Sequence, residues 1–358
     1  MHGRDALSLR GPLMVYGAYG RTGTMIARVA LKRGHNVVLS GSDRDRLNRL
    51  SAELGVPGVV LRLDDQLRLR EHIRNLACVI HVAGPFASTF RQMLEACSAE
   101  EVPYVDLNGE LDVFRAMEEF VADQQPSIPV VSGAGFGVVA GESAAMHAAS
   151  MLKQPHRVWV GVAPDLATRS PGAVASTLRV LAEGGASVQN GQLVSERVGR
   201  RSFTAILNSR SETFTSMPLG ELWATRRSTT VSSVIAGVRL PPGERILLRS
   251  GVLPLLARSE MIRRQLVAHL HTSMTKRERI FESKVWARAE DTEGQTAQIE
   301  LKMGEGYQWS AEAAVRVAEG VANDPRPGLS TAGQYLGKEF ALSIPSTKLV
   351  KLPNGAFR

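Results

Sequence analysis

The sequence is poor in cysteine and in aromatic residues, and it has no long apolar run. Cys78 and Cys97 are the only cysteines among 358 residues, so we expect no disulfide framework and no metal site. No apolar run is long enough to cross a bilayer, and residues 1–11 lack the apolar stretch of a secretion signal. These absences favour a cytoplasmic globular protein, and its length allows two domains.

Charge is unevenly distributed along the chain. The formal net charge is +8, and the stretch from Arg197 to Arg279 alone carries +10, from fifteen Lys and Arg against five Glu. Nearly all of these cations are arginine, which binds carboxylates and phosphates in bidentate fashion. No aromatic stacking set or known reading motif accompanies them, which disfavours nucleic acid. A carrier- or coenzyme A-bound acyl group, an acidic substrate or a membrane surface fits this charge; arginines on a solvated face are the simpler alternative.

Three glycines mark the most informative segment, MVYGAYGRTG. An apolar strand over residues 12–16 ends at Gly17, and helical spacing of apolar residues follows over 21–33. In such a unit Gly17 permits the turn, Gly20 lets a pyrophosphate approach the backbone, and Gly23 lets the helix pack close to the strand. The pattern predicts a dinucleotide site.

The residues after the second predicted strand, 36–40, bear on the choice of cofactor. The group that contacts the adenosine ribose lies about twenty residues after the glycine turn. No carboxylate stands at that strand tip, and Ser42, Arg44 and Arg46 can hold a ribose phosphate. We therefore expect NADP(H) in preference to NAD(H). The alternative is that Ser42 or Asp43 simply caps the helix from Arg44 to Leu54.

Strands and helices alternate along the first half of the chain. We expect strands at 12–16, 36–40, 58–63, 78–83, 103–107 and 128–132, and helices at 21–33, 43–54, 66–75, 87–100, 111–124 and 139–152. This order predicts the α/β class, with a Rossmann-type doubly wound parallel sheet. The ligand is expected outside the C-terminal ends of the strands.

The pattern changes after Pro155. We expect a strand at 157–162, a helix at 171–181, a hairpin of 283–289 with 297–302, a helix at 310–322 and a strand within 335–345. Residues 252–274 read as a basic amphipathic stretch, which covers a neighbouring domain or subunit or lies on a membrane. The sequence thus predicts a dinucleotide-binding domain (1–152), a second α+β domain with a mixed sheet for substrate or dimerisation (153–330), and a C-terminal segment (331–358) that packs on the first domain.

Polar and glycine-rich tips follow three further strands, and they complete the candidate site. The fourth strand ends in Ala83-Gly84-Pro85-Phe86, the fifth in Tyr104-Val105-Asp106-Leu107-Asn108-Gly109-Glu110, and the sixth in Gly133-Ala134-Gly135-Phe136-Gly137. We assign cofactor contacts to residues of the glycine turn and the strand tips, substrate contacts to Asn108 and Phe136, and proton donation to Glu110, Asp106 or Tyr104. The cofactor residues are Gly17, Ala18, Tyr19, Gly20, Arg21, Thr22, Gly23, Ser40, Ser42, Arg44, Asp64, Ala83, Gly84, Pro85 and Phe86.

Each proposed proton donor has a structural alternative. Asp106 can brace its loop, Tyr104 can belong to the core, and Glu110 can cap the following helix. His81, inside a strand, is expected to be a core histidine. A donor from the second domain or a water molecule also fits.

In their order, these motifs resemble the saccharopine dehydrogenase-like oxidoreductases. Ser170-Pro171-Gly172-Ala173, Gly306-Tyr307, Pro327 to Ala332 and Leu336 to Phe340 are similar to C-terminal landmarks of the branch that includes trans-acting enoyl reductases. Two positions depart from the pattern: Ser42 stands where the family usually has arginine, and Ala140 to Glu142 where it usually has proline and an acid. The chain is also short for a true saccharopine reductase.

The resemblance implies an NAD(P)H-dependent reductase that delivers hydride to an activated, enoyl-type C=C bond of a biosynthetic intermediate, carrier-bound acyl groups included. Imine (C=N) reduction of the saccharopine-reductase type is the alternative. A non-catalytic dinucleotide-binding sensor or a membrane-peripheral protein is the alternative of another class. We expect a small-molecule substrate and a homodimer.

Overall fold

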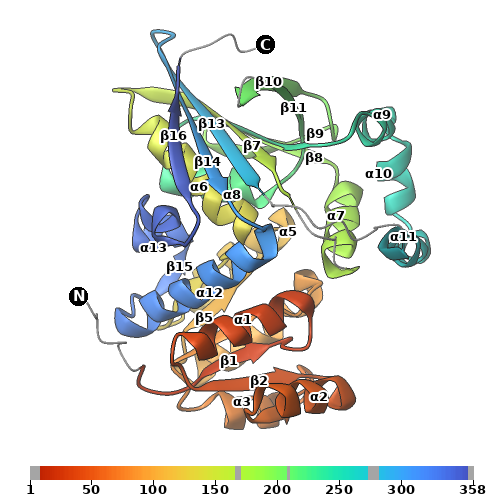
Figure 1. Cartoon of the computed structure of the whole chain (residues 1–358), viewed down its shortest axis with the longest axis vertical. Coiled ribbons are helices and arrows are strands. Elements are labelled where there is room, and N and C mark those ends of the chain that lie inside the picture. The colour runs from red at the N-terminus through yellow and green to blue at the C-terminus, as the bar shows by residue number, and fades with distance from the viewer. Residues whose placement is uncertain (1–8, 166–170, 208–209, 273–281, 354–358) are drawn as a thin grey trace. The chain divides into compact units, whose positions relative to one another are not determined.

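The computed structural model describes residues 9–165, 171–207, 210–272 and 282–353, which form two compact units (Figure 1). The first unit runs to Asn108 and adds Asp112–Gly135 and Ser310–Leu336. The second holds Gly109–Leu111, Phe136–Trp309 and the chain from Gly337 onward. The chain therefore crosses between the units several times, which a linear division of the sequence does not show.

The first unit is built on a seven-stranded parallel sheet in the order β15-β6-β5-β4-β1-β2-β3. The order reverses between β1 and β4, where an open α/β sheet binds its ligand. All six predicted strands and the helices between them are present, which confirms the Rossmann-type sheet. The strands are β1 (Leu13–Tyr16), β2 (Val37–Gly41), β3 (Gly58–Val60), β4 (Cys78–His81), β5 (Tyr104–Asp106), β6 (Pro129–Val131) and β15 (Gly328–Ser330); the helices are α1 (Arg21–Lys32), α2 (Arg44–Leu54), α3 (Gln66–Ile73), α4 (Phe90–Ala99) and α5 (Leu111–Gln124), with η1 (Phe86–Ser88) before α4.

The C-terminal region corrects three expectations. The part that returns to the first unit is Ser310–Leu336, which brings β15 beside β6, and not residues 331–358. Instead of a strand within 335–345 there are α13 (Ala332–Leu336) and η2 (Phe340–Ser343), and the last strand is β16 (Lys348–Leu352), paired with β14 of the second unit. Likewise α6 (Phe136–Ala149), expected in the first domain, belongs to the second unit. Strand pairings distant in sequence place β15 and β16, and packing contacts place α6.

The second unit contains a mixed sheet with the path β10-β11-β12-β7-β13-β14-β16. Only β12 and β7 are parallel along this path, and the predicted hairpin is confirmed as β13 with β14. Its strands are β7 (Pro155–Ala163), β8 (Gly185–Gln189), β9 (Gln192–Glu196), β10 (Ser202–Leu207), β11 (Arg210–Ser216), β12 (Ser233–Arg239), β13 (Ser283–Asp291) and β14 (Thr296–Met303); its helices are α6, α7 (Pro171–Glu183), α8 (Gly220–Ser228), α9 (Pro242–Ser250), α10 (Val252–Ala257) and α11 (Glu260–Thr272), and α12 (Gly306–Asn323) runs from it into the first unit.

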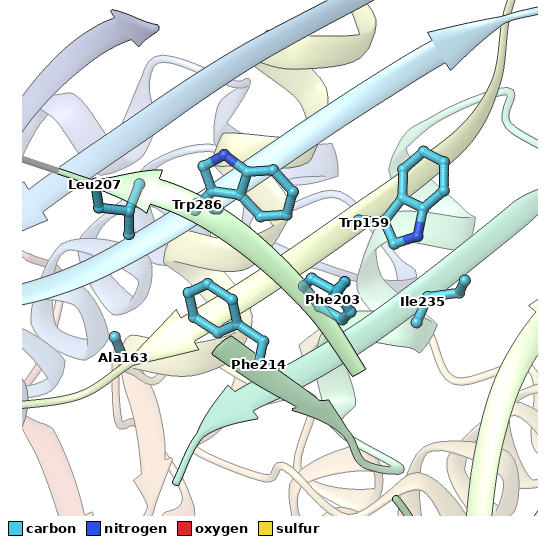
Figure 2. Packing of buried hydrophobic residues seen from close by; sticks show 8 residues of the cluster. Trp159, Ala163, Phe203, Leu207, Phe214, Ile235 and Trp286 are labelled. Atoms are coloured by element: carbon cyan, nitrogen blue, oxygen red, sulfur yellow. The ribbon is translucent and has the colours of Figure 1, made fainter. Parts of the chain in front are cut away.

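An aromatic cluster holds this mixed sheet together (Figure 2). The rings of Phe203 and Phe214 stack at 5.5 Å between centroids, and Phe214 stacks on Trp286 at 6.1 Å. Gly161 lies on β7, next to β13, and its lack of a side chain lets Phe214 approach Trp286. A Cβ at Gly161 would lie 2.8 Å from the Phe214 ring. The sheet thus curls until side chains of β11 reach across β7 to β13, and the rings bury one another. No helix of the described ranges is long and apolar enough to cross a membrane.

Candidate functional site

The glycine turn has the geometry of a pyrophosphate cradle. Gly17 adopts φ +91°, and the Gly20 amide donates to the Gly17 carbonyl oxygen at 3.0 Å. Helix α1 begins at Arg21 with no side-chain cap and no acidic residue in its first turn. Unpaired N–H groups at a helix N-terminus attract anions. The residues present therefore fit a dinucleotide pyrophosphate.

Two of the three glycines are required by close contacts between backbones. A Cβ on Gly17 would lie 2.9 Å from the Ala83 nitrogen, at the tip of β4. A Cβ on Gly23 would lie 2.3 Å from the Gly17 carbonyl oxygen. The turn thus packs tightly against both its own helix and the neighbouring strand tip, as the sequence predicts for β1 and β4.

At the tip of β2, Tyr19 of the glycine turn gathers the polar residues. Its hydroxyl lies 3.2 Å from the Ser42 Oγ, and its ring covers Gly41, where a Cβ would lie 2.4 Å from ring carbon Cε1. The Arg46 guanidinium stands 4.6 Å from the centroid of that ring and donates to the Tyr19 carbonyl oxygen at 3.2 Å. Tyr19, Ser42 and Arg46 therefore form a ribose-end cluster that carries one positive charge.

The other residues predicted to contact the ribose end of the cofactor do not join this cluster. The Asp43 carboxylate accepts from the Arg46 amide at 3.0 Å and caps α2, as the alternative interpretation expected. Arg44 is exposed on the first turn of α2, and Arg46, not Arg44, contacts the glycine turn. Ser40 is buried and donates to the Val59 carbonyl oxygen. Asp64 is exposed, and the bidentate Arg62 guanidinium beside it lowers the pKa of its carboxyl.

A hydroxyl group just after η1 fixes the tip of β4. Thr89 Oγ1 donates to the Ala83 carbonyl oxygen at 2.7 Å, and Gly84 and Pro85 are exposed. Phe86 is buried and packs edge-on against His81 at 5.6 Å between centroids. Burial lowers the pKa of His81 to about 3. His81 is therefore a neutral core histidine, as expected from its place inside a strand.

Tyr104 and Asp106 form a buried relay under the strand tips. His81 Nδ1 lies 3.0 Å from the Tyr104 hydroxyl, which donates to Asp106 Oδ2 at 2.9 Å. Because that hydroxyl has one proton, His81 donates through Nδ1. The other oxygen, Oδ1, accepts from the Asn108 amide (2.9 Å), the Ser132 hydroxyl (2.7 Å) and the Gly133 amide (3.0 Å).

The relay leaves no surface for a substrate. Tyr104, Asp106 and His81 are completely buried, and Asn108 is 1% exposed. Burial raises the pKa values of both Tyr104 and Asp106. This geometry favours the bracing interpretation, in which Asp106 ties the tips of β5 and β6 together, over proton donation by either residue.

Glu110 lies in a separate cluster, within the second unit. Its carboxylate accepts from the Ser176 hydroxyl at 2.9 Å and lies 3.3 Å from Arg179 Nε, both on α7. Its backbone pairs with Leu219 in an isolated antiparallel bridge. Phe136, predicted to contact the substrate, is buried at the start of α6, edge-on to Trp309 at 5.9 Å between ring centroids. The printed contacts of the Glu110 carboxylate are thus with α7, which it fastens through Ser176 and Arg179.

Glu221 is a buried titratable side chain that the sequence analysis did not single out. It lies on the first turn of α8 and is 5% exposed. Its side chain fills the space over two glycines of α6: a Cβ on Gly137 would lie 2.6 Å from Glu221 Oε1, and one on Gly141 would lie 2.5 Å from its Cγ. The glycines Gly137 and Gly141, one helical turn apart, were the available signal. Burial raises the pKa of Glu221 to about 7.

This carboxyl makes stability depend on pH. The pKa of Glu221 is higher in the folded than in the unfolded chain. Its contribution to the free energy of unfolding is therefore fully present below about pH 4.5 and is lost as the pH rises through 7. We expect Glu221→Gln, which stays neutral, to gain about 3 kcal/mol of unfolding free energy relative to the natural chain between pH 5 and pH 8.5. Urea unfolding at both values measures the difference. Glu95→Gln, on an exposed part of α4, is the control; equal pH profiles for Glu221→Gln and the natural chain would contradict the expectation.

Comparison with known proteins shows what the chain is similar to. Residues 13–129 match the model of the saccharopine dehydrogenase NADP binding domain. Saccharopine dehydrogenase (L-Glu forming) from Saccharomyces cerevisiae has a similar structure: TM-score 0.67, 11% identity, with 96% of this chain and 100% of that chain covered. Homospermidine synthase from Legionella pneumophila, solved in complex with NAD, gives TM-score 0.63 and 8% identity over 97% of this chain and 92% of that chain. No curated protein sequence matches this chain. These structures share the fold of both units.

Proposed function

We propose that the chain is a saccharopine dehydrogenase-like oxidoreductase, because residues 13–129 match that family's NADP binding domain, and that it uses NADPH to reduce an activated C=C bond of an acyl-type biosynthetic intermediate. The observation that carries the proposal is the uncapped N-terminus of α1 beside the ribose-end cluster of Tyr19, Ser42 and Arg46. The preference for C=C rests on the C-terminal landmarks that resemble the enoyl reductase branch.

The residues of the first unit divide the cofactor between them. The Gly17–Gly23 turn and the first turn of α1 would hold the pyrophosphate. Arg46 and Ser42 would hold the phosphate on the adenosine ribose, since arginine is suited to bidentate phosphate contact. The exposed Gly84 and Pro85 would border the nicotinamide ribose. When bound, NADPH would supply the hydride.

We assign the proton to the pair of Glu110 and Ser176. A reduced C=C bond needs one proton after hydride transfer, and an acid or base within hydrogen-bond reach of the reacting group supplies it. The Ser176 hydroxyl is partly exposed and is bonded to Glu110, while Arg179 holds that carboxylate in place. Of the three proton donors expected from the sequence, Glu110 is the one next to a partly accessible hydroxyl.

Turnover tests this assignment. NADPH oxidation should be seen with an α,β-unsaturated acyl thioester, and Glu110→Gln should lower kcat by about 100-fold with an unchanged Kd for NADPH. Glu183→Gln removes the other carboxylate near Arg179, at 3.6 Å, and should leave turnover nearly unchanged. Equal losses in both variants would refute the role of Glu110.

The second candidate function is imine reduction, which the full-length likeness to yeast saccharopine dehydrogenase supports. NADPH oxidation only with an oxo acid and an amine together would favour it.

The preference for NADPH is tested separately. Arg46→Ala should weaken NADPH binding by about tenfold or more and leave NADH binding nearly unchanged, because a charge-assisted contact to the extra phosphate is lost. Fluorescence titration with both cofactors measures this. Arg49→Ala, exposed on the same helix, serves as the matched control. If the two cofactors lose affinity equally in Arg46→Ala, Arg46 acts only by supporting Tyr19.

A further inference from the structure

Large apolar side chains are exposed in one short stretch of the second unit. The described residues expose ten such side chains, and six of them lie between Ile246 and Met261. Soluble proteins expose apolar residues singly, and a contiguous set marks a contact surface. The six, which we call the α9–α11 face, are Ile246, Leu247, Val252, Leu255, Leu256 and Met261, with exposed fractions from 40% to 70%.

These helices are apolar on two sides. Leu248 and Ala257 point inward and belong to a buried cluster with Leu181, Val198 and Met217. Helices α10 and α11 also pack against α7, beside which they lie in Figure 1. The inward side therefore already supplies the packing that holds α9–α11 in the unit. The exposed aliphatic side chains add nothing to that packing, and their presence calls for an outside partner.

Arginine outnumbers acidic residues along these helices. Residues 242–272 contain five Arg against two Glu. Arg249 and Arg258 are exposed, and neither pairs with a carboxylate in the part of the chain that the structure describes. Arg263 is used internally, since it donates to the Ala257 carbonyl oxygen at 2.6 Å. Exposed apolar side chains with two such arginines on the same helices complement a surface that is apolar inside and negatively charged at its edge.

We propose that the α9–α11 face docks the protein on an anionic lipid bilayer. The six aliphatic side chains would enter the boundary between head groups and acyl chains, and Arg249 and Arg258 would contact lipid phosphates. A second copy of this chain is a poor occupant, because symmetric pairing would bring the same arginines together. A protein partner would lack aromatic anchors here, since residues 242–272 contain no Trp, Tyr or Phe, which are enriched in protein interfaces.

Vesicle sedimentation of the full chain tests the proposal. We expect binding to phosphatidylcholine vesicles that contain phosphatidylglycerol, weaker binding at high salt, and little binding to pure phosphatidylcholine. The double variant L255Q/M261Q and the double variant R249Q/R258Q should each weaken binding by about tenfold or more. Leu67→Gln, 79% exposed on α3, and Arg49→Gln, on α2, are the matched controls and should bind like the natural chain.

Several outcomes would overturn the proposal. These are equal binding to neutral and anionic vesicles, no binding to either, or equal losses in the controls. Gel filtration adds a further readout: if L255Q/M261Q turns a dimer into a monomer, the face is an interface between copies. If an acidic carrier protein binds the chain while vesicles do not, the partner is a protein. NADPH turnover of the variants on a water-soluble substrate should stay unchanged, so docking can fail while the proposed reaction stands.

Discussion

Gly23→Ala is expected to abolish measurable NADPH binding at ordinary cofactor concentrations, with an affinity loss of about 100-fold or more. The added methyl group would lie 2.3 Å from the Gly17 carbonyl oxygen and 2.9 Å from the Ala18 Cα. Both neighbours are backbone atoms, so no side chain can turn away. The start of α1 must move by about 1 Å, and a shift of that size at a binding site costs about two orders of magnitude. The same overpacking should lower the unfolding free energy by about 1–3 kcal/mol.

Two further variants separate cofactor binding from folding. A methyl group on Gly20 meets only the Gly17 oxygen, at 3.2 Å. Gly20→Ala should therefore fold normally and still weaken NADPH and NADH alike, because it blocks the approach of the pyrophosphate. Gly243→Ala, in α9, has open space around the new methyl and should leave cofactor binding unchanged, with a stability gain of about 0.4–1 kcal/mol from the lower entropy of the unfolded chain. Fluorescence titration and thermal unfolding of all three variants give the answer, and wild-type affinity in Gly23→Ala would show that the turn does not bind the cofactor.

Asp106→Ala is expected to lower the unfolding free energy by about 3–5 kcal/mol. The substitution takes the acceptor from four donors in a fully buried site: the Asn108 and Gly133 amides and the Ser132 and Tyr104 hydroxyls. An unsatisfied buried donor costs about 1–3 kcal/mol, and relaxation recovers part of the sum. The tips of β5 and β6 would come apart, and cofactor binding at that sheet edge would weaken as well.

Asp106→Asn provides a sharper test than loss of stability alone. The amide oxygen can accept the three bonds that Oδ1 now accepts, and its nitrogen can donate to the Tyr104 oxygen. Tyr104 would then donate to His81 Nδ1, which reverses the direction of the relay and moves the His81 proton to Nε2. We expect a loss of only about 1 kcal/mol in urea unfolding. An Asn variant as unstable as Asp106→Ala would mean that the negative charge, and not the hydrogen bonds, holds the strand tips.

Local signals in the sequence were sufficient for the first sheet. The apolar run Leu13–Tyr16, the turn at Gly17 and the cap Asp43 act within a few residues, so each strand and helix is specified where it stands. The same holds for the hairpin of β13 and β14, whose alternating pattern and short turn fix its register. The strands β8 to β12 were not predicted, because the curl that buries Phe203 and Phe214 depends on Gly161 in a distant strand.

The candidate site divides in the same way. From the sequence by itself one obtains the glycine turn, the absence of a carboxylate at the β2 tip and the polar run from Tyr104 to Glu110, since these are properties of short segments. Only the tertiary structure decided that Arg46 and not Arg44 joins Tyr19, that Asp106 is an internal brace, and that Glu110 meets Ser176 and Arg179. It also decided that Glu221 is buried over α6 and that six apolar side chains of α9–α11 point outward. Spacing along a chain sets which residues share a strand tip, whereas the contacts and burial that give each side chain its charge, partner and exposure come from segments far apart in sequence.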